Sequence, residues 1–237
     1  DVKELATAVL VSLSADQMNG LTGDQIAAMT TLQVSKLSAA QLASWDTFQL
    51  QGLTTAHAGV LTVAQIAALD SSQVSKLDAE DFKVLSTGVI KSLSDAQLDG
   101  LSDQQILDLT TTQAAALTAS QIAGLSSLQV AAMETLDFAK LSTSAITGLT
   151  TAQSSILSPE QIAALSTAQF KAMEAADLGS LSTVAIAGMT TDQAKVLTPS
   201  QIVDLTSAQI AAIDVVDIQQ FSTAVISGLT AAQGKGL

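Results

Sequence analysis

The sequence contains no cysteine, tyrosine or arginine, and these absences exclude several classes of function. Without cysteine, the chain has neither disulfide bonds nor thiolate metal sites. Its nine basic residues are scattered lysines against 22 acidic residues, which gives a net charge of −13. Nucleic acid and anionic membrane surfaces are therefore poor partners, because both draw on clustered positive charge.

Prolines, aromatic residues and long apolar runs are also scarce, although 48% of the residues are hydrophobic. The two prolines and 3% aromatic content leave Leu, Ile, Val and Ala to build the core. No apolar run is long enough to span a membrane, so we expect no membrane insertion. The opening residues DVKELATAVL lack the basic segment and cleavage site of a secretion signal.

An eight-residue repeat, here called the octad, runs from Leu5 to residue 236 without insertion or deletion. Position one is Leu in 22 of the 29 octads and is never polar. Position two is Ser or Thr in 22, position five is Gln in 19, and position six is a large apolar residue in 24. The unit is L-[ST]-x-x-Q-[IVL]-x-x.

This pattern is typical of a capping box with a hydrophobic staple, and it predicts a new helix in every octad. The Ser or Thr at position two is the N-cap and the Gln at position five is N3, as in the pairs Ser158 with Gln161 and Thr198 with Gln201. Both prolines, Pro159 and Pro199, fall at position three, the N1 site where a missing N–H costs nothing. Glycine recurs at position eight, where we expect the helix to stop.

Three architectures compete, and only a string of very short helices agrees with the pattern. In one long helix, an octad would rotate the apolar positions by roughly 80°, so they would wind around the whole surface. A β-solenoid favours alternating β-branched segments, whereas Ala and Gln dominate here.

Nucleating a short helix costs about 4 kcal/mol. A cap returns about 1 kcal/mol, and burying one Leu and one Ile returns roughly 3–6 kcal/mol. Each helix must therefore be covered by its neighbours, which predicts an all-α superhelical solenoid.

A second, five-octad period is superimposed on the first, and we call it the 40-residue period. Position six lapses to a small residue at Ala58, Ala114, Ser154, Ala194 and Gly234. Three octads later, acidic pairs occupy positions two and five: Asp78/Asp81, Glu134/Asp137, Glu174/Asp177 and Asp214/Asp217. The next octad replaces the position-five Gln by Val89, Ala145, Ala185 or Val225.

We interpret residues 1–237 as one continuous array that is a segment of a longer one. Its 40-residue units are 53–92, 109–148, 149–188 and 189–228, and residues 93–108 are two inserted octads. We expect a unit to form one or more whole turns of the superhelix. On that hypothesis, Val89 and Ala145 mark helices buried against the adjacent turn, and their exposure should differ from that of Gln161.

Few residues are candidates for a catalytic or metal-binding role, and each of them also has a purely structural explanation. His57 takes the place of Gln at position five and has no second His with which to bind zinc. The acidic pairs are candidate calcium ligands or paired catalytic carboxylates, but each also suits the first turn of a helix as a substitute for the Ser/Gln box. The densest acidic patch is Asp95, Asp99, Asp103 and Asp108, a weak calcium candidate that a solvated face explains better. Trp45 stands at position one and is expected to pack in the core.

The octad runs at 117–130 and 157–170 resemble the L-T-x-x-Q-[IV]-x-x arrays of very large secreted or surface proteins of Gram-negative bacteria, which are often labelled adhesins or haemagglutinin-like exoproteins. This resemblance implies an extracellular or cell-surface location, with the chain acting as a non-catalytic stalk, spacer or adhesive array. No catalytic motif is present, so we expect neither enzymatic activity nor a cofactor. The partners expected are neighbouring repeats of the parent chain, with a protein or cell-surface partner left open. The alternative is an α-solenoid scaffold that binds a peptide or protein in its groove.

Overall fold

The computed structural model describes residues 2–236, and within them the only regular elements are 28 α-helices and two short 3-10 helices. Every α-helix has four to six residues, one helix per octad. The predicted fold class, an all-α solenoid of very short helices, is confirmed. The chain divides into two compact units, Asp1–Ala116 and Leu117–Leu237, which are described separately.

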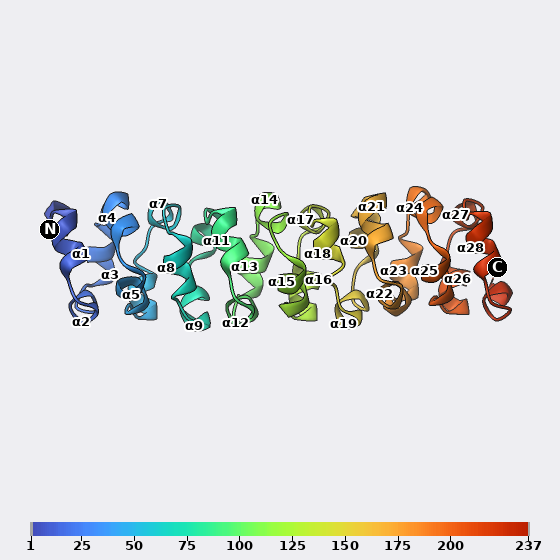
Figure 1. Cartoon of the computed structure of the whole chain (residues 1–237), viewed down its shortest axis with the longest axis horizontal. Coiled ribbons are helices and arrows are strands. Elements are labelled where there is room, and N and C mark those ends of the chain that lie inside the picture. The colour runs from blue at the N-terminus through green and yellow to red at the C-terminus, as the bar shows by residue number, and fades with distance from the viewer. Residues whose placement is uncertain (1, 237) are drawn as a thin grey trace. The chain divides into compact units, whose positions relative to one another are not determined.

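The helices of both units follow one another at octad spacing (Figure 1). The first unit contains η1 (Val2–Glu4), α1 (Thr7–Ser12), α2 (Ala15–Met18), α3 (Gly23–Ala27), α4 (Thr31–Lys36), α5 (Ala39–Ala43), α6 (Thr47–Leu50), α7 (Thr55–Ala58), α8 (Val63–Ala67), α9 (Ser71–Val74), α10 (Ala79–Lys83), α11 (Thr87–Ser92), α12 (Asp95–Asp99), α13 (Asp103–Leu107) and α14 (Thr111–Ala114). The second contains α15 (Ala119–Gly124), α16 (Ser127–Ala132), α17 (Thr135–Phe138), α18 (Thr143–Ile146), α19 (Thr151–Ser154), α20 (Pro159–Ala164), α21 (Thr167–Ala172), α22 (Ala175–Ser180), α23 (Thr183–Ala187), α24 (Thr191–Val196), α25 (Pro199–Val203), α26 (Ser207–Ala212), α27 (Val215–Ile218), α28 (Thr223–Gly228) and η2 (Gln233–Gly236).

Where a helix has six residues, two extended residues separate it from the next helix, as after α20. Its N-cap Ser158 is extended at φ −80° and ψ 157°, and Pro159 begins the helix at N1. The helix stops at Leu165, which is extended again at φ −65° and ψ 135°. Ser166 then caps the next helix. Positions one and two of each octad therefore redirect the chain before a helix can lengthen.

The core consists of positions one and six. Every position-one residue from Met29 to Phe221 is buried, including Trp45, which packs in the core as expected. Position-six residues such as Ile162 and Phe170 are fully buried. Neither residue of an octad could be covered by its own short helix, so neighbouring octads provide the core that makes the helices stable.

Within each unit, a helix packs against the helix three octads further along. In the first unit, α4 packs on α7, and α9 packs on α12. In Figure 1 the first pair lies along the upper edge of this unit and the second pair along its lower edge. In the second unit, α20 packs on α23 and α22 on α25. Side-chain hydrogen bonds between neighbouring turns join residues 28 and 31 positions apart, as at Gln193. One turn of the superhelix therefore takes between three and four octads.

The interpretation of the 40-residue unit as whole turns is wrong. A spacing of 28 to 31 residues between turns does not divide into 40. Val89, Ala145 and Gln161 are 1%, 0% and 2% exposed, so position five is equally buried whether or not it holds Gln. The 40-residue period therefore changes the side chain at position five without changing its burial at these three residues.

Glycine at position eight lies where helices stop, as predicted: Gly100 and Gly188 are C-caps, and α15 and α28 end at Gly124 and Gly228. No glycine within residues 2–236 has a positive φ. A Cβ built on Gly52 would lie 2.6 Å from the Cα of Gly23, and one on Gly188 would lie 2.6 Å from the Cβ of Pro159. Both partners stand at position three of an octad in the preceding turn. Glycine therefore permits the close approach of two backbones rather than an unusual dihedral angle.

Among residues 2–236, none of the helices has the length and apolar character that crossing a membrane requires.

Candidate functional site

The position-five glutamine forms the main polar site of the molecule, because its amide joins two turns. The Oε1 of Gln193 accepts a hydrogen bond from the N–H of Thr190 at 2.9 Å. The N–H of Gln193 donates to the Thr190 Oγ1 at 3.3 Å, which completes the capping box. The Nε2 of the same side chain donates to the carbonyl oxygens of Ile162 and Leu165, each at 2.7 Å. One buried amide thus caps its own helix and binds two carbonyls of the preceding turn.

This arrangement recurs through both units, and we call it the glutamine ladder. The rungs with both bonds at offsets of 31 and 28 residues include Gln41 (Leu10 and Leu13), Gln65 (Val34 and Leu37), Gln97 (Ile66 and Leu69), Gln105 (Val74 and Leu77), Gln153 (Ile122 and Leu125) and Gln233 (Ile202 and Leu205). Other rungs, such as Gln73 and Gln209, use the carbonyl at offset 30 in place of the one at 31. The position-six carbonyl already accepts the N–H of the position-one residue that follows it, as Ile162 accepts that of Leu165, so the glutamine adds a second hydrogen bond to this carbonyl and one to the carbonyl of the extended position-one residue.

The capping residues named from the sequence lie on this ladder. Ser158 and Gln161 exchange both bonds of a capping box at 3.1 Å, and Thr198 and Gln201 do so at 3.1 and 3.2 Å. The Nε2 of Gln161 also donates to two carbonyls of the preceding turn, at 3.2 and 3.3 Å. Sequence reasoning identified the local bonds and missed those between turns.

His57 is a rung of the ladder with an imidazole in place of the amide. Its Nδ1 accepts the N–H of Thr54 at 3.2 Å, while its Nε2 lies 2.8 Å from the Met29 carbonyl oxygen. Since a carbonyl oxygen can only accept, the hydrogen of the neutral ring lies on Nε2. His57 therefore reproduces the two roles of glutamine, as its position in the octad predicts.

We expect His57→Gln to leave stability within about 0.5 kcal/mol, because the amide remakes both bonds. His57→Leu should lower the free energy of unfolding by about 2–3 kcal/mol, since a buried N–H and a buried carbonyl lose their partner. Urea unfolding of the two variants beside the original chain measures the difference. Equal losses in both would show that only the shape of the ring matters.

The acidic pairs depart from the predicted cap. Asp78, Glu134 and Glu174 stand at the N-cap but accept no side-chain cap bond, and Asp214 accepts one only from the N–H of Val216. Their position-five partners are buried: Asp81, Asp137, Asp177 and Asp217 are 3% to 7% exposed. The pairs therefore do not replace the Ser/Gln box, because each puts its second carboxyl into the interface between turns.

Burial raises the pKa of three of these carboxyl groups, those of Asp81, Asp137 and Asp177. It raises the pKa of Asp137 and of Asp177 to about 6, with a smaller contribution from the negative charge of Glu134 or Glu174. Burial also raises the pKa of Asp81, although a hydrogen bond with the Thr55 side chain opposes the shift. A neutral acid is favoured in each case because desolvation disfavours the charged form.

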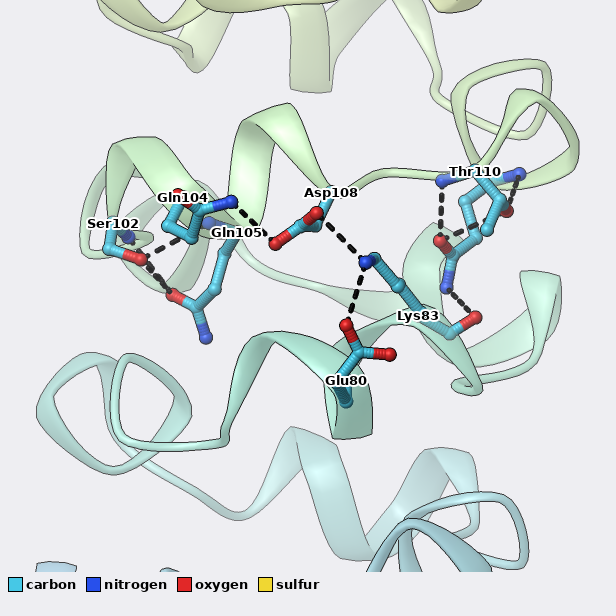
Figure 2. A network of polar contacts seen from close by, with 8 residues as sticks. Glu80, Lys83, Ser102, Gln104, Gln105, Asp108 and Thr110 are labelled. Atoms are coloured by element: carbon cyan, nitrogen blue, oxygen red, sulfur yellow. Dashed lines mark hydrogen bonds and ion pairs between the residues drawn. The ribbon is translucent and has the colours of Figure 1, made fainter.

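The calcium candidates do not come together as a metal site. Residues 2–236 contain no group of three or more His, Asp or Glu side chains placed to hold a metal ion. Asp108 is engaged in the network of Figure 2, where the Lys83 Nζ lies 2.9 Å from both its Oδ1 and the Glu80 Oε1. Gln104 also donates to the Asp108 Oδ2 at 2.7 Å. These two hydrogen bonds, first that of Gln104 and then that of Lys83, lower the pKa of Asp108.

The remaining members of that acidic patch are ordinary helix residues. Asp95 and Asp103 are the first residues of α12 and α13, and Asp99 is the last residue of α12. Asp95 and Asp103 thus suit the N-termini of their helices, and Asp108 belongs to one ion-pair network, but the four residues form no common ligand site among residues 2–236.

A buried hydroxyl without a hydrogen-bond partner lies at one of the octads whose position six holds a small residue instead of a large apolar one. The Oγ of Ser154 makes no hydrogen bond, and the residue is fully buried. Because alanine occupies the equivalent positions 58, 114 and 194, we expect Ser154→Ala to raise the free energy of unfolding by about 1 kcal/mol. The exposed neighbouring variant Ser155→Ala serves as the control in thermal unfolding and should change little. A loss of stability in Ser154→Ala would show that the hydroxyl has a bonding role.

The short helices, the shared core and the glutamine ladder define the class: an α-helical solenoid repeat protein. The family model of the ALTTAQ repeat matches residues 1–31, 74–111, 130–167 and 170–207, more than half of the chain. The chain therefore belongs to the ALTTAQ repeat family, and its residues 149–153 read LTTAQ. The last three matched segments begin at positions 74, 130 and 170, with the same spacings that separate Asp81, Asp137 and Asp177. Comparison with curated proteins gave no match.

Proposed function

We propose that this chain is a non-catalytic structural segment of a very large bacterial surface or secreted protein, where it serves as stalk, spacer or adhesive array. The observation that carries the proposal is the glutamine ladder. The glutamine at position five recurs along the chain, and at rungs such as Gln193 and Gln153 it is buried and joins two turns. A sequence that commits its regular polar residues to stacking is suited to extending an array by addition of octads.

The acidic balance supports the same role. The net charge of −13 favours solubility and opposes unspecific association between copies. The resemblance of the octads to arrays in exported Gram-negative proteins supports a location outside the cell.

Surface proteolysis of the parent protein in its own cells tests this proposal. An antibody against residues 117–237 should detect a full-length product that protease added to intact cells removes. A cytosolic marker in the same sample should survive, which controls for lysis. Protection of the repeat segment together with the marker would contradict the surface location.

A peptide-binding scaffold is the second candidate, and exposed apolar side chains at position four favour it. Those more than half exposed are Leu32, Phe48, Leu128, Leu136, Val184 and Val216. Replacing Phe48 and Leu128 by serine should leave a spacer fully functional in cell adhesion. Loss of adhesion at unchanged stability would contradict a passive stalk or spacer and show that these side chains contact a partner.

A further inference from the structure

Asp177 occupies a rung of the ladder without the donor that a rung needs. At this position glutamine supplies one acceptor for its own helix and N–H donors for the carbonyls 31 and 28 residues earlier. In register, the carbonyls that correspond to Asp177 are those of Ile146 and Leu149. An ionised carboxylate has acceptor oxygens only, so it offers these carbonyls no hydrogen bond.

The helices packed around Asp177 provide no cation to balance a negative charge. Its side chain is 3% exposed, and its Oδ2 has no hydrogen-bond partner. Its helix α22 packs against α19 and α25, neither of which contains an acidic or basic residue. The nearest charged groups along these elements are acidic: Glu174 at the N-cap of α22 and Asp204 at the C-cap of α25.

The adjacent lysine also lies elsewhere. Lys171 belongs to α21, which packs against α18 and α24 rather than against α22. A buried carboxylate that lacks a cation and a full set of donors is costly, and the neutral acid removes that cost.

The same site contains two other features of the 40-residue period. Ser154 on α19, the helix that packs on α22, is the small residue at position six, and its hydroxyl is also buried without a partner. Ala185, in the octad after that of Asp177, replaces the glutamine of the following rung. Two successive rungs of the ladder are thus without an amide at this interface between turns.

We propose that Asp177 is a proton-binding rung: the folded array takes up a proton on this carboxyl, and its O–H takes the donor role that the glutamine amide has elsewhere. Binding of the proton couples the stability of the second unit to pH. The array becomes more resistant to unfolding in mildly acidic surroundings than at neutral pH.

The direction of this coupling follows from the pKa. Burial, and then Glu174, raise the pKa of Asp177 to about 6 in the folded chain, against an ordinary value of 3.8. Between these values the folded state binds more protons than the unfolded state, so stability falls as pH rises through this window. The stabilisation is complete below about pH 4 and is lost above about pH 6.

The test compares the whole chain with its Asp177→Asn variant, since asparagine imitates the neutral acid. We expect both chains to unfold alike in urea at pH 4. At pH 7.5, the unfolding equilibrium constant of the original chain should exceed that of the variant by up to about 100-fold. The control Asp103→Asn removes an exposed first-turn carboxylate and should leave the pH dependence unchanged.

A direct titration keeps the test valid if the variant folds poorly. The ¹³Cγ resonance of Asp177, followed by NMR in the original chain, should titrate with a midpoint near pH 6. A midpoint at or below pH 4, or an Asp177→Asn variant that is no more stable than the original chain at pH 7.5, would overturn the proposal.

Discussion

Gln193→Met is expected to lower the free energy of unfolding by about 2–4 kcal/mol, although methionine matches glutamine in length and is more apolar. The change removes the side-chain partner of the Thr190 N–H and of the Leu165 carbonyl, and it leaves the Ile162 carbonyl with the N–H of Leu165 as its donor. An unsatisfied buried polar group costs about 1–3 kcal/mol, which exceeds the gain from burying a more apolar side chain. Urea unfolding followed by circular dichroism measures the loss.

Gln25→Met provides the matched control. Gln25 forms the same capping box with Thr22, with bonds of 2.8 and 3.3 Å, but its side chain is exposed. Losing the box alone should cost less than about 1 kcal/mol. If the two variants lost equal stability, capping would explain the whole role of glutamine and the ladder would be energetically neutral.

Gly188→Ala is expected to destabilise the second unit by about 2–3 kcal/mol. Replacing glycine by alanine usually stabilises a protein where the backbone conformation suits alanine, so the expected effect has the opposite sign. The new Cβ would lie 2.6 Å from the Cβ and the carbonyl oxygen of Pro159, closer than real Cβ contacts come. One of the two turns must move, and overpacking of this kind costs about 1–3 kcal/mol. Thermal unfolding measures the change.

Gly228→Ala is the control at the same octad position. Its Cβ would lie 3.6 Å from the Cβ of Pro199, an ordinary van der Waals distance. We expect no loss, and a gain of up to about 1 kcal/mol, because alanine restricts the unfolded chain. Equal destabilisation by both changes would contradict the account of position eight as the place where backbones approach.

The start of the helix in each octad could be predicted from the sequence because the residues that cap it are close neighbours in the chain. Capping atoms lie within one helical turn of one another, as in Ser158 and Gln161, and the position of Pro159 at N1 depends on its own octad alone. Burial of positions one and six followed from the energy of a helix too short to stand alone.

The number of octads per turn could not be predicted in the same way. It depends on how far two extended residues, such as Leu165 and Ser166, rotate one helix against the next. Small differences in these dihedral angles accumulate around a turn, and no residue type fixes them. The 40-residue period was therefore mistaken for the turn, although neighbouring turns are 28 to 31 residues apart.

One signal for the ladder was present and overlooked. A capping box accepts Glu as well as Gln at N3, yet position five holds Glu in none of the 29 octads. The structure gives the reason, since a carboxylate accepts the cap bond but cannot donate to the carbonyls of the preceding turn. The burial of Asp81 and Asp177 was missed because a first-turn acidic residue is usually solvated and favoured by the helix dipole.

The central claim is that glutamine side chains hold successive turns together, and NMR of the Gln193 side-chain amide tests it most directly. We predict nuclear Overhauser effects from its Nε2 protons to residues 162–165, together with slow exchange of these protons with solvent. The amide of Gln25 should exchange freely in the same sample. Contacts of the Gln193 amide confined to residues 190–194, with exchange as fast as that of Gln25, would contradict the account.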